Sequence, residues 1–140
     1  MQACWPKRSG DMIAIDTNII VRYLTNDHPK QSLRARALID GEAVFVSVTV
    51  MLEVEWVLRS TYEYRASDVA RAIRSFAGLP TVTVEDSPIV AAALDLAEGG
   101  MDFADALHLG KAAHCEGMAS FDRKFVKAAS AAGYVNVREA

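Results

Sequence analysis

The sequence has little of what marks secreted, zinc-binding or membrane-spanning proteins. Only two of its 140 residues are cysteine, and Cys4 lies in an N-terminal segment without a regular pattern. We therefore expect no structural disulfide and a reducing, cytoplasmic compartment. No apolar run approaches the ~20 residues that span a bilayer, so no membrane partner is expected. Residues 1–11 are basic but lack an apolar core, which excludes a secretory signal and predicts a flexible N-terminal extension.

Histidine and positive charge are also scarce. No Cys or His pair has the spacing of a zinc site, because His114 and Cys115 are adjacent and cannot face one point from a helix. No Ser/His or Cys/His nucleophile arrangement is evident, and we expect His108 to be a packed or surface residue. The net charge is −3 and the sequence pI is about 5.6. Nucleic-acid binding would therefore need local basic patches or a metal.

Hydrophobic residues, by contrast, make up 51% of the chain, enough for a real core in one domain over residues 12–140. Short apolar runs alternate with segments of helical pattern. The expected strands are 12–16, 43–46, 81–84, 118–120 and 134–137, and the expected helices are 18–24, 29–39, 49–59, 67–78, 87–98, 103–115 and 123–131. This alternation predicts an α/β fold, a three-layer α/β/α sandwich with a central parallel sheet of about five strands. We expect the first strand to be central.

Four carboxylates stand out in these elements: Asp16, Asp105 and Asp122 near element ends, and Glu53 within the apolar helix 49–59. Acids at the ends of buried elements are costly unless they are paired or bound to a cation. Acids at the carboxyl ends of parallel strands meet at the edge where ligands bind. The pattern therefore predicts one oxygen-rich cluster that suits Mg²⁺ or Mn²⁺.

Each acid also has a simpler reading. Asp16 and Asp122 are good helix caps, and Asp105 is favoured by a helix dipole. Glu53 could be a core residue paired with a buried arginine. Glu55 can pair with Arg59, four positions later, on an exposed face of the helix. Glu53 points to nearly the opposite side, so we expect it to be the functional acid of that helix.

Four short motifs occur in order: Ile-Asp-Thr-Asn, Ser-Val-Thr-Val-Met-Leu-Glu, Asp-Phe-Ala-Asp-Ala-Leu-His and Ser-Phe-Asp-Arg-Lys-Phe. Together they resemble a PIN-domain ribonuclease, and more narrowly a VapC-type toxin of a bacterial toxin–antitoxin pair. The resemblance covers the chain from Met12 to its end. It implies a metal-dependent endoribonuclease that cleaves RNA with a metal-activated water.

The resemblance also implies which residues act. The four acids would be the catalytic residues and the ligands of Mg²⁺ or Mn²⁺, and Asp102 would be a secondary acid. The polar neighbours that would orient them are Thr17, Asn18, Ser47 and Thr49. The expected partners are RNA, a cognate antitoxin and a second copy of the chain. The competing reading is a non-catalytic PIN-like binding module.

Basic and apolar side chains suggest where such partners bind. The candidates for RNA phosphates are Arg22, Lys30, Arg34, Arg36, Arg123 and Lys124, and those for an antitoxin or dimer contact are Arg65, Arg71 and Arg74. A surplus of apolar surface near the early helices favours a homodimer, and its members are Tyr23, Leu24, Leu33, Trp56, Tyr62 and Tyr64.

Overall fold

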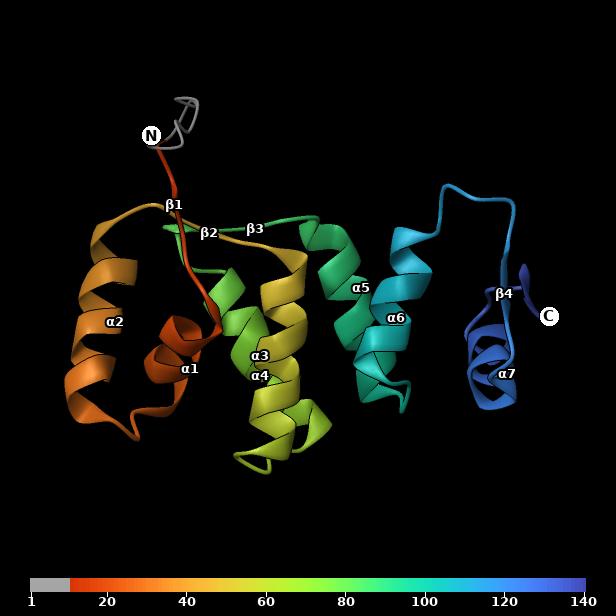
Figure 1. The fold of residues 1–140 in the computed structure, drawn as a ribbon, viewed down its shortest axis with the longest axis horizontal. Coiled ribbons are helices and arrows are strands. Elements are labelled where there is room, and N and C mark those ends of the chain that lie inside the picture. The colour runs from red at the N-terminus through yellow and green to blue at the C-terminus, as the bar shows by residue number, and fades with distance from the viewer. Residues whose placement is uncertain (1–10) are drawn as a thin grey trace, which may run out of the picture.

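The computed structural model of the chain describes residues 11–140 (Figure 1). The predicted N-terminal extension therefore lies, except for its last residue, outside the described residues. The elements follow the order β1 (Ile13–Ala14), α1 (Thr17–Thr25), α2 (Pro29–Gly41), β2 (Val44–Val46), α3 (Val48–Ser60), α4 (Ala66–Ala77), β3 (Val82–Val84), α5 (Ser87–Glu98), α6 (Phe103–Lys111), β4 (Met118–Ser120), α7 (Arg123–Ala131) and β5 (Val137–Glu139).

All strand pairs are parallel, which confirms the predicted α/β fold. β1, β2 and β3 form one sheet in that order, with Ile13 opposite Val44 and Val44 opposite Val82. β4 and β5 form a second sheet, with Met118 opposite Val137. The central sheet thus has three strands rather than about five, and the expectation that the first strand is central is wrong, since β1 is an edge strand.

The α5–α6 helix pair separates the two sheets. In Figure 1 this pair lies between the three-stranded sheet and a C-terminal unit of β4, α7 and β5. The main core is built from the first three strands and from helices up to α6. The C-terminal unit packs on α6 through a second, small cluster, in which Leu109 of α6 meets Phe125, Ala129 and Val137. The unit is therefore not packed onto the main sheet.

Apolar spacing explains why α3 is the central helix of the core. Met51, Val54 and Leu58 recur at helical intervals and are fully buried. Ser47 begins the helix by accepting a hydrogen bond from the amide of Val50 at 3.2 Å. No helix among the described residues is long and apolar enough to cross a membrane.

Several predicted boundaries are wrong. Helix α4 starts at Ala66 instead of residue 67, with Arg65 at its cap position, and α6 ends at Lys111 instead of residue 115. The last strand lies at Val137–Glu139 instead of 134–137, because Tyr134 and Val135 form an exposed turn before it.

Candidate functional site

Asp16 and Glu53 come close together through a threonine. Asp16 follows β1 and caps α1, because its Oδ1 accepts a hydrogen bond from the amide of Ile19 at 3.2 Å. The next residue, Thr17, is buried, and its hydroxyl donates to Oε1 of Glu53 on α3. This hydroxyl therefore fixes the Glu53 carboxylate beside the start of α1. Glu53 is exposed, as an acid that receives an ion or a substrate must be.

A second group of acids lines a cleft of about 390 Å³ between α6 and α7. Asp102 caps α6 by accepting from the amide of Asp105 at 3.2 Å, and Asp122 caps α7 by accepting from the amide of Phe125 at 3.1 Å. Asp105 is half-buried in the same cleft. Burial raises the pKa of Asp105, and the charges of Asp102 and Asp122 raise it further. The three carboxylates therefore act on one another electrostatically.

Glu55 and Arg59 extend this cleft from the side of α3. Glu55 is buried and binds the guanidinium of Arg59 through two hydrogen bonds of 2.5 and 3.1 Å. This bond from Glu55 raises the pKa of Arg59, and the Asp102 charge contributes to the same shift. The pairing agrees with the sequence prediction, but the predicted exposed face is wrong. Glu55 lies on the buried stripe of α3 with Met51 and Leu58, and that helical spacing is the signal that the sequence reading missed.

The four predicted acids are thus divided between two places. Asp16 and Glu53 lie by α1 and α3, whereas Asp105 and Asp122 line the cleft by α6 and α7. Over residues 11–140, no three Asp, Glu, His or Cys side chains are close enough together to hold a metal ion. The oxygen-only donors fit Mg²⁺ or Mn²⁺ in chemistry. The described residues of a single chain do not form such a metal group, and the joint role of the four acids stays a prediction.

A family model, described as the PIN domain, matches residues 13–131. The chain belongs to the PIN domain family. No curated protein matches it. The resemblance read from the four motifs is confirmed at the level of the family. PIN domains are generally metal-dependent nucleases, and the acidic cleft is consistent with that class of enzyme.

A second cleft of this PIN domain, about 410 Å³, lies between α1 and α2 and borders Asp16. Asn18, Arg22 and Arg34 line it together with apolar residues of α2. It brings two of the predicted phosphate-binding arginines beside one of the predicted catalytic acids. Its mixed lining suits a polar or anionic chain better than a purely apolar ligand.

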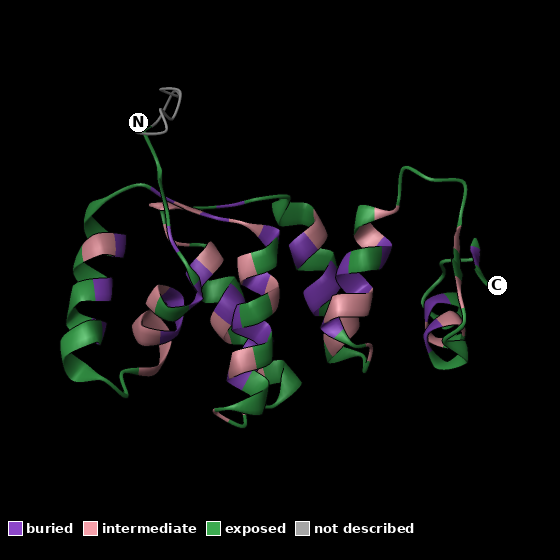
Figure 2. Cartoon of the chain, viewed as in Figure 1, coloured by how far each residue is buried: buried purple, intermediate pink, exposed green. Residues whose placement is uncertain are grey.

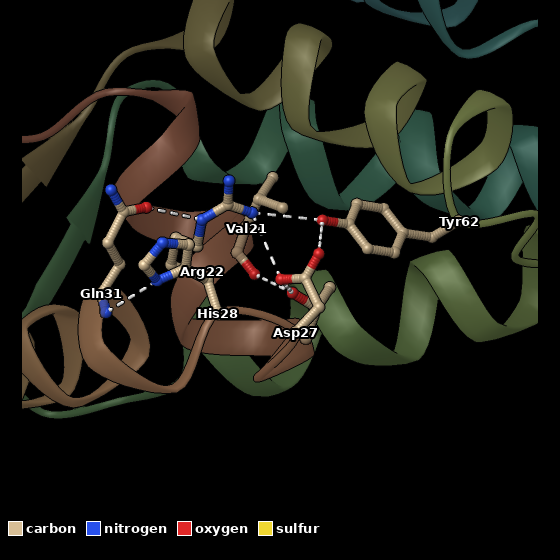
Figure 3. Close-up of polar contacts among 7 residues, drawn as sticks. Val21, Arg22, Asp27, His28, Gln31 and Tyr62 are labelled. Atoms are coloured by element: carbon tan, nitrogen blue, oxygen red, sulfur yellow. Dashed lines mark hydrogen bonds and ion pairs between the residues drawn. The ribbon is translucent and has the colours of Figure 1, made fainter.

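A network of hydrogen bonds orients Arg22 at that cleft (Figure 3). The guanidinium donates to Gln31 at 2.8 Å, to Asp27 at 3.2 Å and to the hydroxyl of Tyr62 at 3.3 Å. Tyr62 in turn donates to Asp27 at 2.5 Å, and this bond lowers the pKa of the Asp27 carboxyl. The side chain of His28 accepts from the Gln31 amide and caps α2. Arg22 is therefore fixed by its neighbours.

The other predicted polar residues have local roles. Ser47 and Thr49 share a hydrogen bond of 3.0 Å at the start of α3, one turn before Glu53. Among the predicted cations, Lys124 lines the acidic cleft, whereas Arg123 pairs with Glu139. The two arginines of α4 predicted for a partner contact pair within the chain, Arg71 with Asp68 and Arg74 with Asp95 and Glu98.

The predicted surplus of apolar surface is smaller than expected. Four of its six members pack against the main core, namely Tyr23, Leu24, Tyr62 and Tyr64. Only Leu33 and Trp56 are exposed. The aromatic residues of the early helices are therefore mainly core residues.

Proposed function

We propose that residues 12–140 form one PIN domain that acts as a metal-dependent endoribonuclease, the toxin of a VapBC-type toxin–antitoxin pair in the cytoplasm. One observation carries this proposal. In a chain of the PIN family, Asp102, Asp105 and Asp122 line one cleft with the cations Arg59 and Lys124. Carboxylates that repel one another attract a divalent cation, and neighbouring cations attract a phosphodiester.

The proposed ligands of Mg²⁺ or Mn²⁺ are Asp16, Glu53, Asp105 and Asp122, with Asp102 as a secondary acid. A bound divalent cation lowers the pKa of a water molecule and so supplies hydroxide near neutral pH. The chain contributes the orientation of the acids. Thr17 fixes Glu53, and the caps on α1 and α7 hold Asp16 and Asp122.

RNA is the proposed substrate because both clefts carry cations that can bind the phosphates of a single strand. Arg59 and Lys124 lie beside the acids of one cleft, and Arg22 and Arg34 line the other. These side chains would bind phosphates without selecting a base sequence. The net charge of −3 makes such local binding necessary, since the chain as a whole repels nucleic acid.

The proposed protein partners are an antitoxin and a second copy of the chain. Leu33 on α2 and Trp56 on α3 are large apolar residues that remain exposed. Exposed aromatic and aliphatic residues are common anchors of protein interfaces. We expect light scattering at micromolar concentration to find a dimer, and a monomer alone would contradict it.

A non-catalytic binding module is the second candidate. It is favoured by the absence of a three-acid metal group over the described residues. In that case the acids would serve as helix caps and as charged surface, and cations would not change what the protein does to RNA.

Cleavage of a defined RNA pool distinguishes the two candidates. Wild-type protein is stripped of metal and assayed with Mg²⁺, with Mn²⁺ and with excess EDTA. The nuclease requires cleavage with either cation and loss of cleavage in EDTA. Asp105→Asn should also abolish cleavage, whereas Glu116→Gln, an exposed acid outside the acidic cleft, is the matched control and should cleave normally. Equal cleavage in EDTA, or none under any condition, would contradict the nuclease.

A further inference from the structure

Within residues 11–140, each of the two sheets ends in strands that pair on one side alone. In the three-stranded sheet these are β1 and β3, and in the two-stranded sheet they are β4 and β5. An unpaired edge presents free amide and carbonyl groups that can pair with another strand. The four edges differ in how well their side chains prevent such pairing.

Charged residues protect one of these edges. β5 carries Arg138 and Glu139. Charge on an edge strand discourages pairing with another strand. β1 (Ile13–Ala14), β3 (Val82–Val84) and β4 (Met118–Ser120) contain no charged residue. Of these three uncharged edges, β1 and β4 are the ones with exposed apolar residues beside them.

Exposed apolar residues flank these two unprotected edges. Ile13 in β1 is 41% exposed, and Met12 before it is 44% exposed. Figure 2 shows the segment that leads into β1 as exposed. Phe121, directly after β4, is 85% exposed, and Val135, just before β5, is 80% exposed. Most of the large exposed apolar side chains of the described chain thus lie beside β1 or in the C-terminal unit. Pairing of β1 with β4 would bury part of this surface.

The same pairing would reunite the divided acids. Asp16 stands two residues after the end of β1, and Asp122 stands two residues after the end of β4. Parallel strands end at the same edge of a sheet, and neighbouring strands are about 4.8 Å apart. With Ala14 opposite Ser120, the two aspartates would lie side by side. The site that the single chain leaves incomplete would then be complete.

We propose that β4 of one chain pairs in parallel with β1 of a second copy, and that the exchange is reciprocal. Each dimer would then have two five-stranded sheets in the order β3-β2-β1-β4-β5. Each site would combine Asp16 and Glu53 of one copy with Asp105 and Asp122 of the other, which line one cleft. Exchange of identical elements between protomers is a low-cost route to a symmetric dimer.

The arrangement of the chain favours a second copy over closure within one chain. β1 and β4 lie towards opposite ends of the long axis in Figure 1, with α5 and α6 between them. The C-terminal unit follows the short segment 112–117 after α6 and packs on the far side of α6 from the main core, through Leu109. It is therefore already held away from its own β1, as an exchanged unit must be.

Cysteine cross-linking tests the pairing without relying on any enzyme activity. The full-length chain first loses its native thiols through Cys4→Ser and Cys115→Ser. The test variant then adds Ala14→Cys and Ser120→Cys, which would place two thiols on paired strands at a Cα separation that a disulfide accepts. Mild oxidation should convert most of the protein to a covalent dimer on a non-reducing gel. The matched control carries Thr83→Cys with Ser120→Cys and should remain largely uncross-linked.

Mixing of inactive variants tests whether the shared site is the proposed nuclease site, and only this arm rests on the proposed function. Asp16→Asn and Asp122→Asn chains, each inactive alone, are unfolded and refolded together. About half of the dimers are then mixed, and each mixed dimer has one intact site of two. We expect about a quarter of the wild-type cleavage rate. If each site instead took Asp16 and Asp122 from the same chain, every site in the mixture would lack one of the two acids, and no activity would return.

The outcomes separate the two proposals. A disulfide within one chain would overturn the exchange, and the absence of any cross-link, or equal cross-linking of the β3 control, would overturn the pairing of β1 with β4. An inactive mixture beside an active wild type would also overturn the exchange. A covalent dimer whose wild type cleaves no RNA would support the exchange and refute the nuclease.

Discussion

Removal of Arg59 should destabilise the protein more than the loss of an ordinary surface ion pair. Among residues 11–140, Arg59 is the one hydrogen-bond partner of the buried carboxylate of Glu55, whose side chain is 5% exposed. Arg59→Met leaves this charge buried without a partner. Fully buried pairs cost about 3–5 kcal/mol when broken in this way. Because the Arg59 side chain is 39% exposed and water can enter, we expect about 2 kcal/mol, or roughly 6–8 °C in Tm.

Thermal and urea unfolding measure this cost. The matched control is Asp68→Asn, which breaks the exposed pair of Asp68 with Arg71 on α4, where the two atoms are 3.6 Å apart. Surface pairs contribute about 0–1 kcal/mol, so this variant should unfold almost like the wild type.

A double variant tests the cause. Glu55→Leu combined with Arg59→Met replaces the pair by apolar side chains and should recover at least half of the lost stability, because no charge then remains buried. Three results would refute the reasoning: an Arg59→Met variant as stable as the Asp68→Asn control, a double variant no more stable than Arg59→Met, or one that loses further stability.

Three further outcomes follow from the structure. Asp16→Asn should abolish RNA cleavage at an unchanged Tm, since asparagine also caps a helix; wild-type activity in Mg²⁺ would refute its role. Because the pKa of Asp105 is raised in the folded state, its negative charge destabilises the fold at pH values above that pKa. Below pH 3.8 the carboxyl is protonated in both the folded and the unfolded state and does not change the stability. Without metal, Asp105→Asn should therefore raise Tm near pH 7 but not at about pH 3, as scanning calorimetry can check. Gly117→Ala should cost ~1–3 kcal/mol in urea unfolding, because its Cβ would lie 2.6 Å from the Asn136 carbonyl oxygen, whereas Gly41→Ala, with open space around it, should not.

Local patterns predicted most of the elements, because those patterns act within a few residues. The spacing of Met51, Val54 and Leu58 identifies α3, and Pro29 marks the start of α2. The family could be read from four short motifs for the same reason. The last strand was misplaced because Tyr134 and Val135 are good strand formers, whereas the structure leaves them in an exposed turn.

The relation between distant elements could not be read in this way. The sequence placed Asp16 and Asp122 directly after strands, and the structure confirms those positions after β1 and β4. Their proximity depends on whether those strands pair, which no local pattern encodes. The same limit applies to Glu55: its pair with Arg59 follows from spacing, but its burial depends on what packs against α3.

The helix caps have a consequence for how this chain can change. Asp16, Asp102 and Asp122 each begin a helix by accepting an amide hydrogen bond, and each is also an acid proposed for chemistry. Asparagine keeps the cap and loses the charge. A single-nucleotide change from an aspartate codon to an asparagine codon could thus remove activity and leave the shape intact. A nuclease built this way lies one mutation from a binding protein that still recognises the same partners.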